Sequence, residues 1–230
     1  MNGPIRRFLR SELAWRLSGL TFPTAVAATN GRVRTLSEYL ELTRSHMAPL
    51  LRWFPPGGTF LEFGSGLGGN LFAVAPRAKS AYGLDINPHY VRIAKGIARR
   101  LGLANVAFRS YNGVSVPAVG PEFDVVFSMG VFERVAHDRA AGYVSGLVAQ
   151  LRPGGSAVLY FLSPSALATT FVRRLGAEAY APWNRGQVIA LLEGRGLTVV
   201  DTVPFKTFPL RKGAGGASVG DFYIGTKAAT

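Results

Sequence analysis

The chain has 230 residues, of which 48% are hydrophobic and 17% are charged, a composition typical of a globular protein and not of a disordered one. It contains no cysteine, which excludes disulfides, cysteine-ligated iron–sulfur clusters and cysteine nucleophiles. Its 26 basic residues outnumber 13 acidic ones, and the net charge of +13 indicates either an anionic partner or a general arginine bias.

The first 54 residues are predicted to form a helical cap ahead of the main domain. Residues 4–20 predict a basic, partly amphipathic helix that could cover a ligand cleft, contact another subunit or lie on a membrane surface. A second helix is predicted from Ser37 to the stop signal at Pro55–Gly58. No signal peptide or membrane-spanning stretch is recognisable, so we expect a cytoplasmic location.

A glycine-rich turn follows the first predicted strand. The apolar strand ends at Phe63, and Gly64–Gly69 then lead into a helix. Glycines there let the backbone approach a ligand closely and offer N–H groups at a helix N-terminus. The next apolar strand ends at Asp85, whose carboxylate can accept hydrogen bonds from both hydroxyls of a ribose. Together these features predict a site for a nucleoside cofactor.

Glu62 decides between two classes of cofactor. Gly64, Gly66 and Gly69 also match the dinucleotide-binding fingerprint, with an acidic residue about twenty positions further on. A carboxylate at the mouth of the loop would repel a pyrophosphate, but it suits the cationic amino group and sulfonium of S-adenosylmethionine. The chain is also too short for the second domain of an ordinary dehydrogenase. The sequence therefore favours S-adenosylmethionine over NAD.

The remaining elements alternate between helices and strands, which predicts a doubly wound α/β domain over residues 55–230 with a mostly parallel, seven-stranded sheet. A helix end and a tight turn are predicted at 151–155, and 163–183 is predicted to be an inserted substrate lid. The other predicted elements are a helix from Asn87–Pro88 to Gly102, a helix over 139–151, a helix over 184–193, and strands over 106–108, 124–127, 156–162, 197–203 and 222–226.

In this order, the glycine loop with Glu62, the strand ending at Asp85, the strand and loop over 123–135 and the turn at 151–155 resemble class I S-adenosylmethionine-dependent methyltransferases over roughly residues 55–226. The resemblance implies a Rossmann-like methyltransferase fold with N-terminal helices and S-adenosyl-L-methionine as cofactor. The cofactor contacts that it implies are Glu62, Gly64, Ser65, Gly66, Asn70, Asp85, Ile86, Asn87, Tyr111, Asn112, Ser128 and Met129.

Catalysis by such an enzyme requires alignment of the acceptor and, for a hydroxyl, removal of its proton. The candidate bases beyond the fourth strand are Glu133, His137 and Asp138, of which histidine has the most suitable reference pKa. In the alternative interpretation, Glu133 pairs with a neighbouring arginine and His137 only begins a helix. Many small-molecule members of the family carry Glu-His where this chain has Glu133-Arg134. The candidate substrate contacts are Arg134, Arg173 and Trp183.

We therefore expect methyl transfer by in-line displacement to an oxygen or nitrogen of a small metabolite or glycan, and an anionic acceptor would suit the basic charge. Ser128 and Ser163 stand where metal-dependent relatives carry ligands, so no metal is expected. Three alternatives stay open: an RNA methyltransferase that uses the basic surface, a short-chain oxidoreductase, and a non-catalytic, cofactor-binding partner subunit. The oxidoreductase lacks its catalytic Tyr-x-x-x-Lys here, and the oligomeric state is not indicated.

Overall fold

The computed structural model describes residues 35–120, 122–165, 181–206 and 218–229. The chain divides into two compact units, Met1–Asp124 and Val125–Thr230, and the boundary between them falls within a strand. The helix predicted over 4–20, Arg173 and most of the predicted lid lie outside the described residues.

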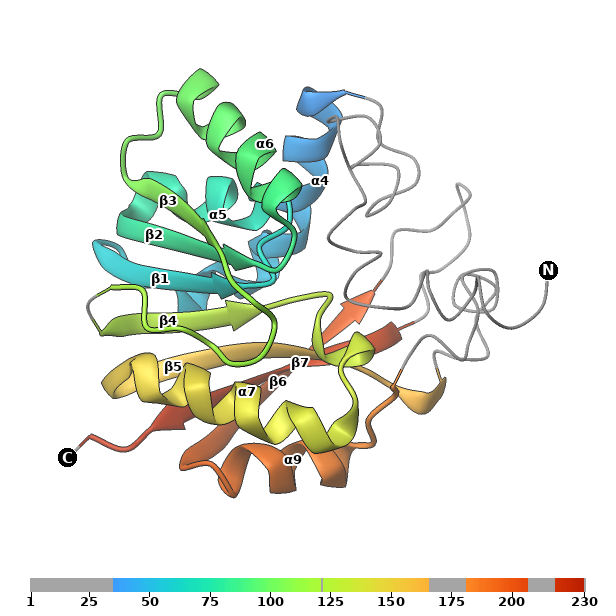
Figure 1. Ribbon diagram of the computed structural model, residues 1–230. Helices are drawn as coiled ribbons and strands as arrows, with labels where there is room; N and C mark the ends of the chain where they lie inside the picture. The colour runs from blue at the N-terminus through green and yellow to red at the C-terminus, as the bar shows by residue number, and fades with distance from the viewer. Residues whose placement is uncertain (1–34, 121, 166–180, 207–217, 230) are drawn as a thin grey trace. The chain divides into compact units, whose positions relative to one another are not determined.

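Seven strands form one mixed, mostly parallel sheet in the order β3-β2-β1-β4-β5-β7-β6. Their bounds are β1 (Gly58–Phe63), β2 (Ala78–Asp85), β3 (Val106–Ser110), β4 (Phe123–Ser128), β5 (Leu151–Leu162), β6 (Leu197–Lys206) and β7 (Ser218–Lys227). β1, β2 and β3 run parallel to one another (Figure 1), whereas β7 is antiparallel to both β5 and β6. The predicted doubly wound sheet and Rossmann-like methyltransferase fold are confirmed.

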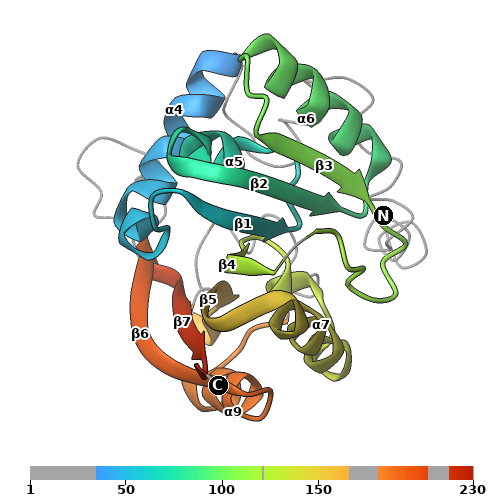
Figure 2. The same ribbon diagram turned by 90° about the vertical axis from the view of Figure 1, so that its left-hand side faces the viewer.

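The described helices of the first unit are α4 (Leu36–Met47), α5 (Gly69–Val74) and α6 (Pro88–Arg100). α4 begins one residue earlier than predicted because Thr35 and Glu38 form a capping box, in which each side chain bonds the other's backbone N–H. Asn87 caps α6 as the Asn-Pro signal predicts. Figure 2 shows the packing that follows, with α4 against α5 and α6 along β3.

Aromatic side chains fill the core of this unit. Phe60 is fully buried, and its ring meets Phe54 edge-on with centroids 5.2 Å apart. Phe108 packs edge-on against Phe72 at 5.8 Å. The same Phe108 ring occupies the space next to Gly83, since a Cβ added to that glycine would lie 2.5 Å from it. The close packing of β2 and β3 therefore requires a residue without a side chain at Gly83.

In the second unit, α7 (His137–Gln150) packs on β5, and α9 (Arg185–Glu193) packs on β6. α7 begins two residues before the predicted start. β5 begins at Leu151, where a helix end and turn are predicted, because the backbone is already extended at that residue with ψ of 135°. Only Gly154 within 151–155 has a positive φ, of 73°. The ladder with β7 starts at Ser156, which matches the predicted strand.

Two glycine substitutions test this packing. Gly83→Ala should lower the free energy of unfolding by about 1–3 kcal/mol, because its Cβ would clash with the Phe108 ring in a filled core. Gly96 lies inside α6 with no atom within 4 Å of an added Cβ, so Gly96→Ala should raise that free energy by about 0.5–1 kcal/mol. Urea unfolding followed by circular dichroism measures both. Equal changes in the free energy of unfolding for the two variants would contradict the close packing described at Gly83.

Candidate cofactor and active site

The loop between β1 and α5 turns through three alternate glycines. Gly64, Gly66 and Gly68 have φ values of 78°, 53° and 85°, in the left-handed region that strains other residues. The backbone N–H groups of Gly64 and Ser65 both donate to the Leu84 carbonyl, at 2.8 and 2.9 Å, which holds the loop against the end of β2. A Cβ on Gly66 would meet no atom within 4 Å, so the backbone is open to a ligand there.

Asp85 ties this loop to the neighbouring segment. Its Oδ2 accepts a hydrogen bond from the Gly66 N–H and its Oδ1 accepts one from the Asn87 N–H, both at 2.7 Å. Burial raises the pKa of Asp85 to about 6, and the two N–H donors oppose that rise. Each carboxylate oxygen keeps a second lone pair, so the group can still accept hydrogen bonds from a ligand's hydroxyls.

Glu62 is buried near the end of β1, and one of its two carboxyl oxygens lacks a hydrogen-bond partner among the described residues. Its Oε1 accepts a hydrogen bond from Asn70 Nδ2 at 2.7 Å, whereas its Oε2 has no hydrogen-bond partner among the described residues. Burial raises the pKa of Glu62 to about 8, and the Asn70 amide opposes that rise. Ser65 Oγ and Asn70 Oδ1 are likewise buried without a partner in the described part of the chain. Three such atoms fit a site that a polar, cationic ligand completes.

α4 holds the loop from the other side through Tyr39, a residue that the sequence analysis did not select. The Tyr39 hydroxyl accepts a hydrogen bond from the Gly69 N–H, at the start of α5, over 3.0 Å. A Cβ on Gly69 would lie 2.4 Å from Thr43 Cγ2 and 2.6 Å from the Tyr39 hydroxyl. Tyr39 and Thr43 are four residues apart, so they share one helix face. This spacing is the feature of the sequence that could have indicated their common contact with the loop.

Four predicted adenine contacts follow β2 and β3: Ile86, Asn87, Tyr111 and Asn112. The Asn87 side chain is used as the cap of α6, since its Oδ1 accepts from the first backbone N–H groups of that helix. Tyr111 lies against Phe63 with ring centroids 5.5 Å apart, and its backbone N–H donates to the Asp85 carbonyl at 3.2 Å. The structure therefore brings Tyr111 to Asp85, as a nucleoside site requires.

In the second unit, a buried carboxyl group follows β4. Ser128 is fully buried and Met129 is half-buried at the strand end. Glu133 is buried, and its Oε2 has no hydrogen-bond partner within the described ranges. Burial raises the pKa of Glu133, and the charge of Arg134 opposes that rise. A buried carboxyl group of this kind has the properties of a proton acceptor.

His137 and Trp183 contact each other. Their ring centroids are 3.9 Å apart, and His137 Nε2 lies 3.2 Å from the Pro182 carbonyl oxygen, to which it donates. Trp183 is buried, and its Nε1 donates to the Phe132 carbonyl at 3.2 Å. The Ala181 N–H donates to the Glu133 carbonyl at 2.7 Å. These contacts fix the segment 181–183 against the 3-10 turn that carries Glu133.

Within the described ranges, no group of three or more histidine, aspartate and glutamate side chains is placed to hold a metal ion. The same part of the chain contains no helix that is both long and apolar enough to cross a membrane. Arg134 is exposed next to Glu133.

Comparison with known proteins adds to this geometry. Residues 60–155 match a protein family described as methyltransferase domain. The ubiquinone biosynthesis O-methyltransferase of Methylobacterium sp. (strain 4-46) is 31% identical over 168 residues, which cover 67% of this chain and 65% of that protein. The chain belongs to the class I S-adenosylmethionine-dependent methyltransferases. The predicted family and its cofactor are thus confirmed, whereas the activity of this chain and the individual contact residues stay predictions.

One more curated relative and one solved structure are also similar to this chain. The 2-heptyl-1-hydroxyquinolin-4(1H)-one methyltransferase of Mycobacteroides abscessus is 26% identical over 109 residues, 47% of this chain and 48% of that protein. The chain thus matches between about half and two thirds of the length of these curated relatives. Magnesium protoporphyrin IX methyltransferase from Synechocystis PCC 6803, solved with bound SAH, superposes with a TM-score of 0.67 at 15% identity, over 97% of this chain and 98% of that one. At this identity the superposition shows a shared fold.

The raised pKa of Glu62 makes the stability of the ligand-free methyltransferase depend on pH. The folded state holds this proton up to about pH 8, whereas the unfolded chain loses it near 4.5. The associated stability is fully present below about pH 4.5 and is lost as the pH rises to about 8. Glu62→Gln should flatten this dependence and be more stable than the wild type by about 1–3 kcal/mol above pH 8. Urea unfolding across this pH range measures the difference, and identical pH profiles for both proteins would contradict it.

Proposed function

We propose that the protein transfers a methyl group from S-adenosylmethionine to an oxygen of a small molecule, with nitrogen as the alternative acceptor atom. The observation that carries the proposal is the buried Glu62, whose Oε2 lacks a partner in the described residues, next to an open glycine loop in a chain of this family. Relatives named for small-molecule substrates favour such an acceptor over RNA.

The cofactor supplies a methyl carbon that its sulfonium has already activated. In the proposed arrangement, Glu62 binds the amino group of the cofactor, which would satisfy the carboxylate oxygen that is otherwise unpaired among the described residues. Gly64–Gly66 lie along the cofactor backbone, and Asp85 accepts hydrogen bonds from the ribose hydroxyls. Asn70 and Ser65 complete the polar surroundings of the amino acid end. Ile86, Asn87, Tyr111 and Asn112 border the adenine.

The acceptor side is proposed from the second unit. Ser128 and Met129 border the methyl group, and Glu133 removes the proton of an acceptor hydroxyl, because its raised pKa makes it a better proton acceptor near neutral pH than an ordinary glutamate. His137 is the second candidate base, although its Nε2 already donates to the Pro182 carbonyl. Arg134, with Trp183 and Arg173, is proposed to bind an anionic acceptor.

Calorimetry tests the cofactor first. S-adenosylhomocysteine should bind with micromolar affinity and NADH should not. Asp85→Ala should abolish this binding, because it removes both the proposed ribose acceptor and the hydrogen bonds to Gly66 and Asn87. Glu193→Ala, which removes an exposed carboxylate on α9, is the matched control and should bind as the wild type does. Preference for NADH would overturn the proposal.

The same titration should detect a change in the protonation of Glu62 when the ligand binds. At neutral pH the carboxyl group is largely protonated, and a bound ammonium group should expel that proton, since opposite charge lowers a carboxyl pKa. Binding measured in two buffers of different ionisation enthalpy should therefore show proton release in the wild type and none in Glu62→Gln. Equal release from both proteins would show that Glu62 does not meet the amino group.

Glu133→Gln tests the proposed base once a screen of small hydroxyl compounds has found an acceptor. It should lower kcat by about 10²–10⁴-fold and leave the affinity for S-adenosylhomocysteine unchanged. The kcat of the wild type should rise with pH through a pKa above that of an ordinary glutamate. His137→Ala is the comparison and should lower kcat less. The opposite ranking would make His137 the base, and turnover itself would exclude the non-catalytic subunit.

A further inference from the structure

One stretch of the first unit has only basic residues among its charged side chains. Residues 86–121 contain five basic residues and no acidic one. All five side chains are exposed on α6 and β3: Arg92, Lys95, Arg99, Arg100 and Arg109. β3 is the edge strand of the sheet, so this face lies at its border. Exposed cations without acidic neighbours in the sequence favour the binding of an anion at this face.

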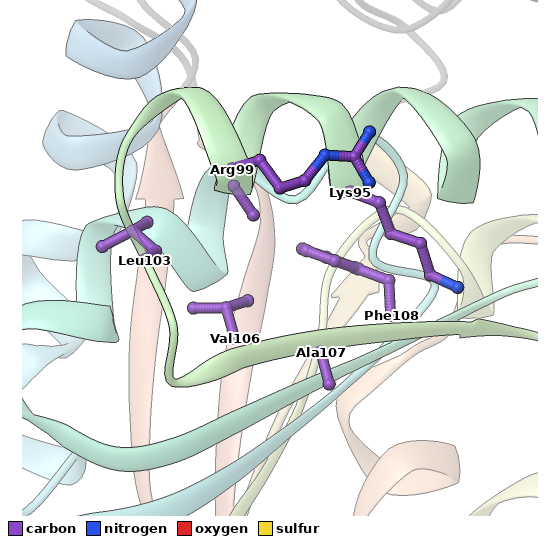
Figure 3. A pocket seen from close by; sticks show the side chains of 7 residues that line it. Lys95, Arg99, Leu103, Val106, Ala107 and Phe108 are labelled. Atoms are coloured by element: carbon purple, nitrogen blue, oxygen red, sulfur yellow. The ribbon is translucent and has the colours of Figure 1, made fainter.

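A pocket of about 290 Å³ opens between α6 and β3 on this face. Figure 3 shows Lys95 extending from the helix toward the strand and Arg99 lying along the helix, with Val106 and Phe108 directed from the strand toward the helix. Leu103 closes one end. The pocket thus combines an apolar floor with two cations, and none of the residues proposed to bind the cofactor lines it.

The two cations stand four residues apart, one turn of helix, and therefore repel each other. Within the described ranges, the structure records no carboxylate partner for either side chain. An anion between Lys95 and Arg99 would relieve this repulsion, and charge-assisted hydrogen bonds to it are stronger than neutral ones. The apolar floor would remain unused by a small inorganic anion, so the geometry requires a ligand with both an anionic head and an apolar body.

We propose that this pocket binds a free, small amphipathic carboxylate, with its head between Lys95 and Arg99 and its hydrocarbon body on Leu103, Val106 and Phe108. The volume lies near the lower limit of roughly 300–1,000 Å³ for ligand pockets, which suits a medium-chain or single-ring carboxylate. The lining contains one aromatic ring, Phe108, whereas binding of single-stranded nucleic acid uses several rings on which successive bases stack. Nucleic acid therefore fits this pocket less well.

Titration calorimetry with octanoate tests the site on the full chain. Octanoate should bind saturably at one site, also in the presence of saturating S-adenosylhomocysteine. Acetate lacks the apolar body and 1-octanol lacks the charge, so each should bind at least about tenfold more weakly. Binding of octanol as strong as that of octanoate, or competition by S-adenosylhomocysteine, would overturn the proposal.

A matched pair of double variants locates the site. Lys95→Gln with Arg99→Gln should weaken octanoate binding at least about tenfold, because both head-group partners are lost. Arg100→Gln with Arg109→Gln removes the same charge from α6 and β3 outside the pocket, and the affinity of this variant should stay within about twofold of the wild type. Equal weakening in both pairs would show a general charge effect. Binding only to vesicles of anionic phospholipid would show a membrane surface and overturn the proposal as well.

Discussion

The carboxylate of Asp85 is the interaction on which the candidate cofactor site depends. One oxygen accepts from Gly66 in the glycine loop, the other accepts from Asn87 at the start of α6, and the backbone carbonyl accepts from Tyr111 after β3. Three segments far apart in the sequence are thus fixed by one buried residue. This arrangement is available because the carboxyl ends of neighbouring parallel strands meet at one edge of a sheet. Its cost is a desolvated carboxyl group, which appears as a raised pKa.

Glu62 repeats this cost with less compensation than Asp85, because its Oε1 accepts a hydrogen bond from Asn70 but its Oε2 accepts none from the described residues. A buried carboxyl oxygen without a partner in the described residues destabilises the folded state, and such groups are rare in proteins unless a ligand satisfies them. The surrounding core offsets the loss: Phe60 and Phe63, on either side of Glu62 in β1, are fully buried. A ligand that supplies the missing partner, as proposed for the cofactor's amino group, would offset the remaining cost.

The features that the sequence predicted correctly depend on residues that are close together in the chain. The glycine spacing, the acidic residue that ends β2 and the Asn87–Pro88 cap each lie within a few residues of what they determine. Tyr39 was missed because its partner Gly69 is 30 residues away, and the hydrogen bond from Trp183 to the Phe132 carbonyl was not predicted because the two residues are 51 positions apart. Neither pairing leaves a periodic signal. The turn predicted at 151–155 was wrong because a single positive φ at Gly154 lets that proline- and glycine-rich stretch continue as a strand.

The second unit links the predicted acceptor-side residues through the backbone instead of through facing side chains. Ala181 donates to the carbonyl of Glu133, and Trp183 donates to the carbonyl of Phe132, so the last residues of the predicted lid are bonded to the turn that carries the candidate base. The His137 ring packs on Trp183 and bonds Pro182, which strengthens the same connection. A displacement of 181–183 would therefore displace the backbone of Glu133. Because proton transfer is sensitive to small changes of position, Ala181 and Pro182, which are not proposed to contact an acceptor, would affect the proposed reaction through the backbone of Glu133.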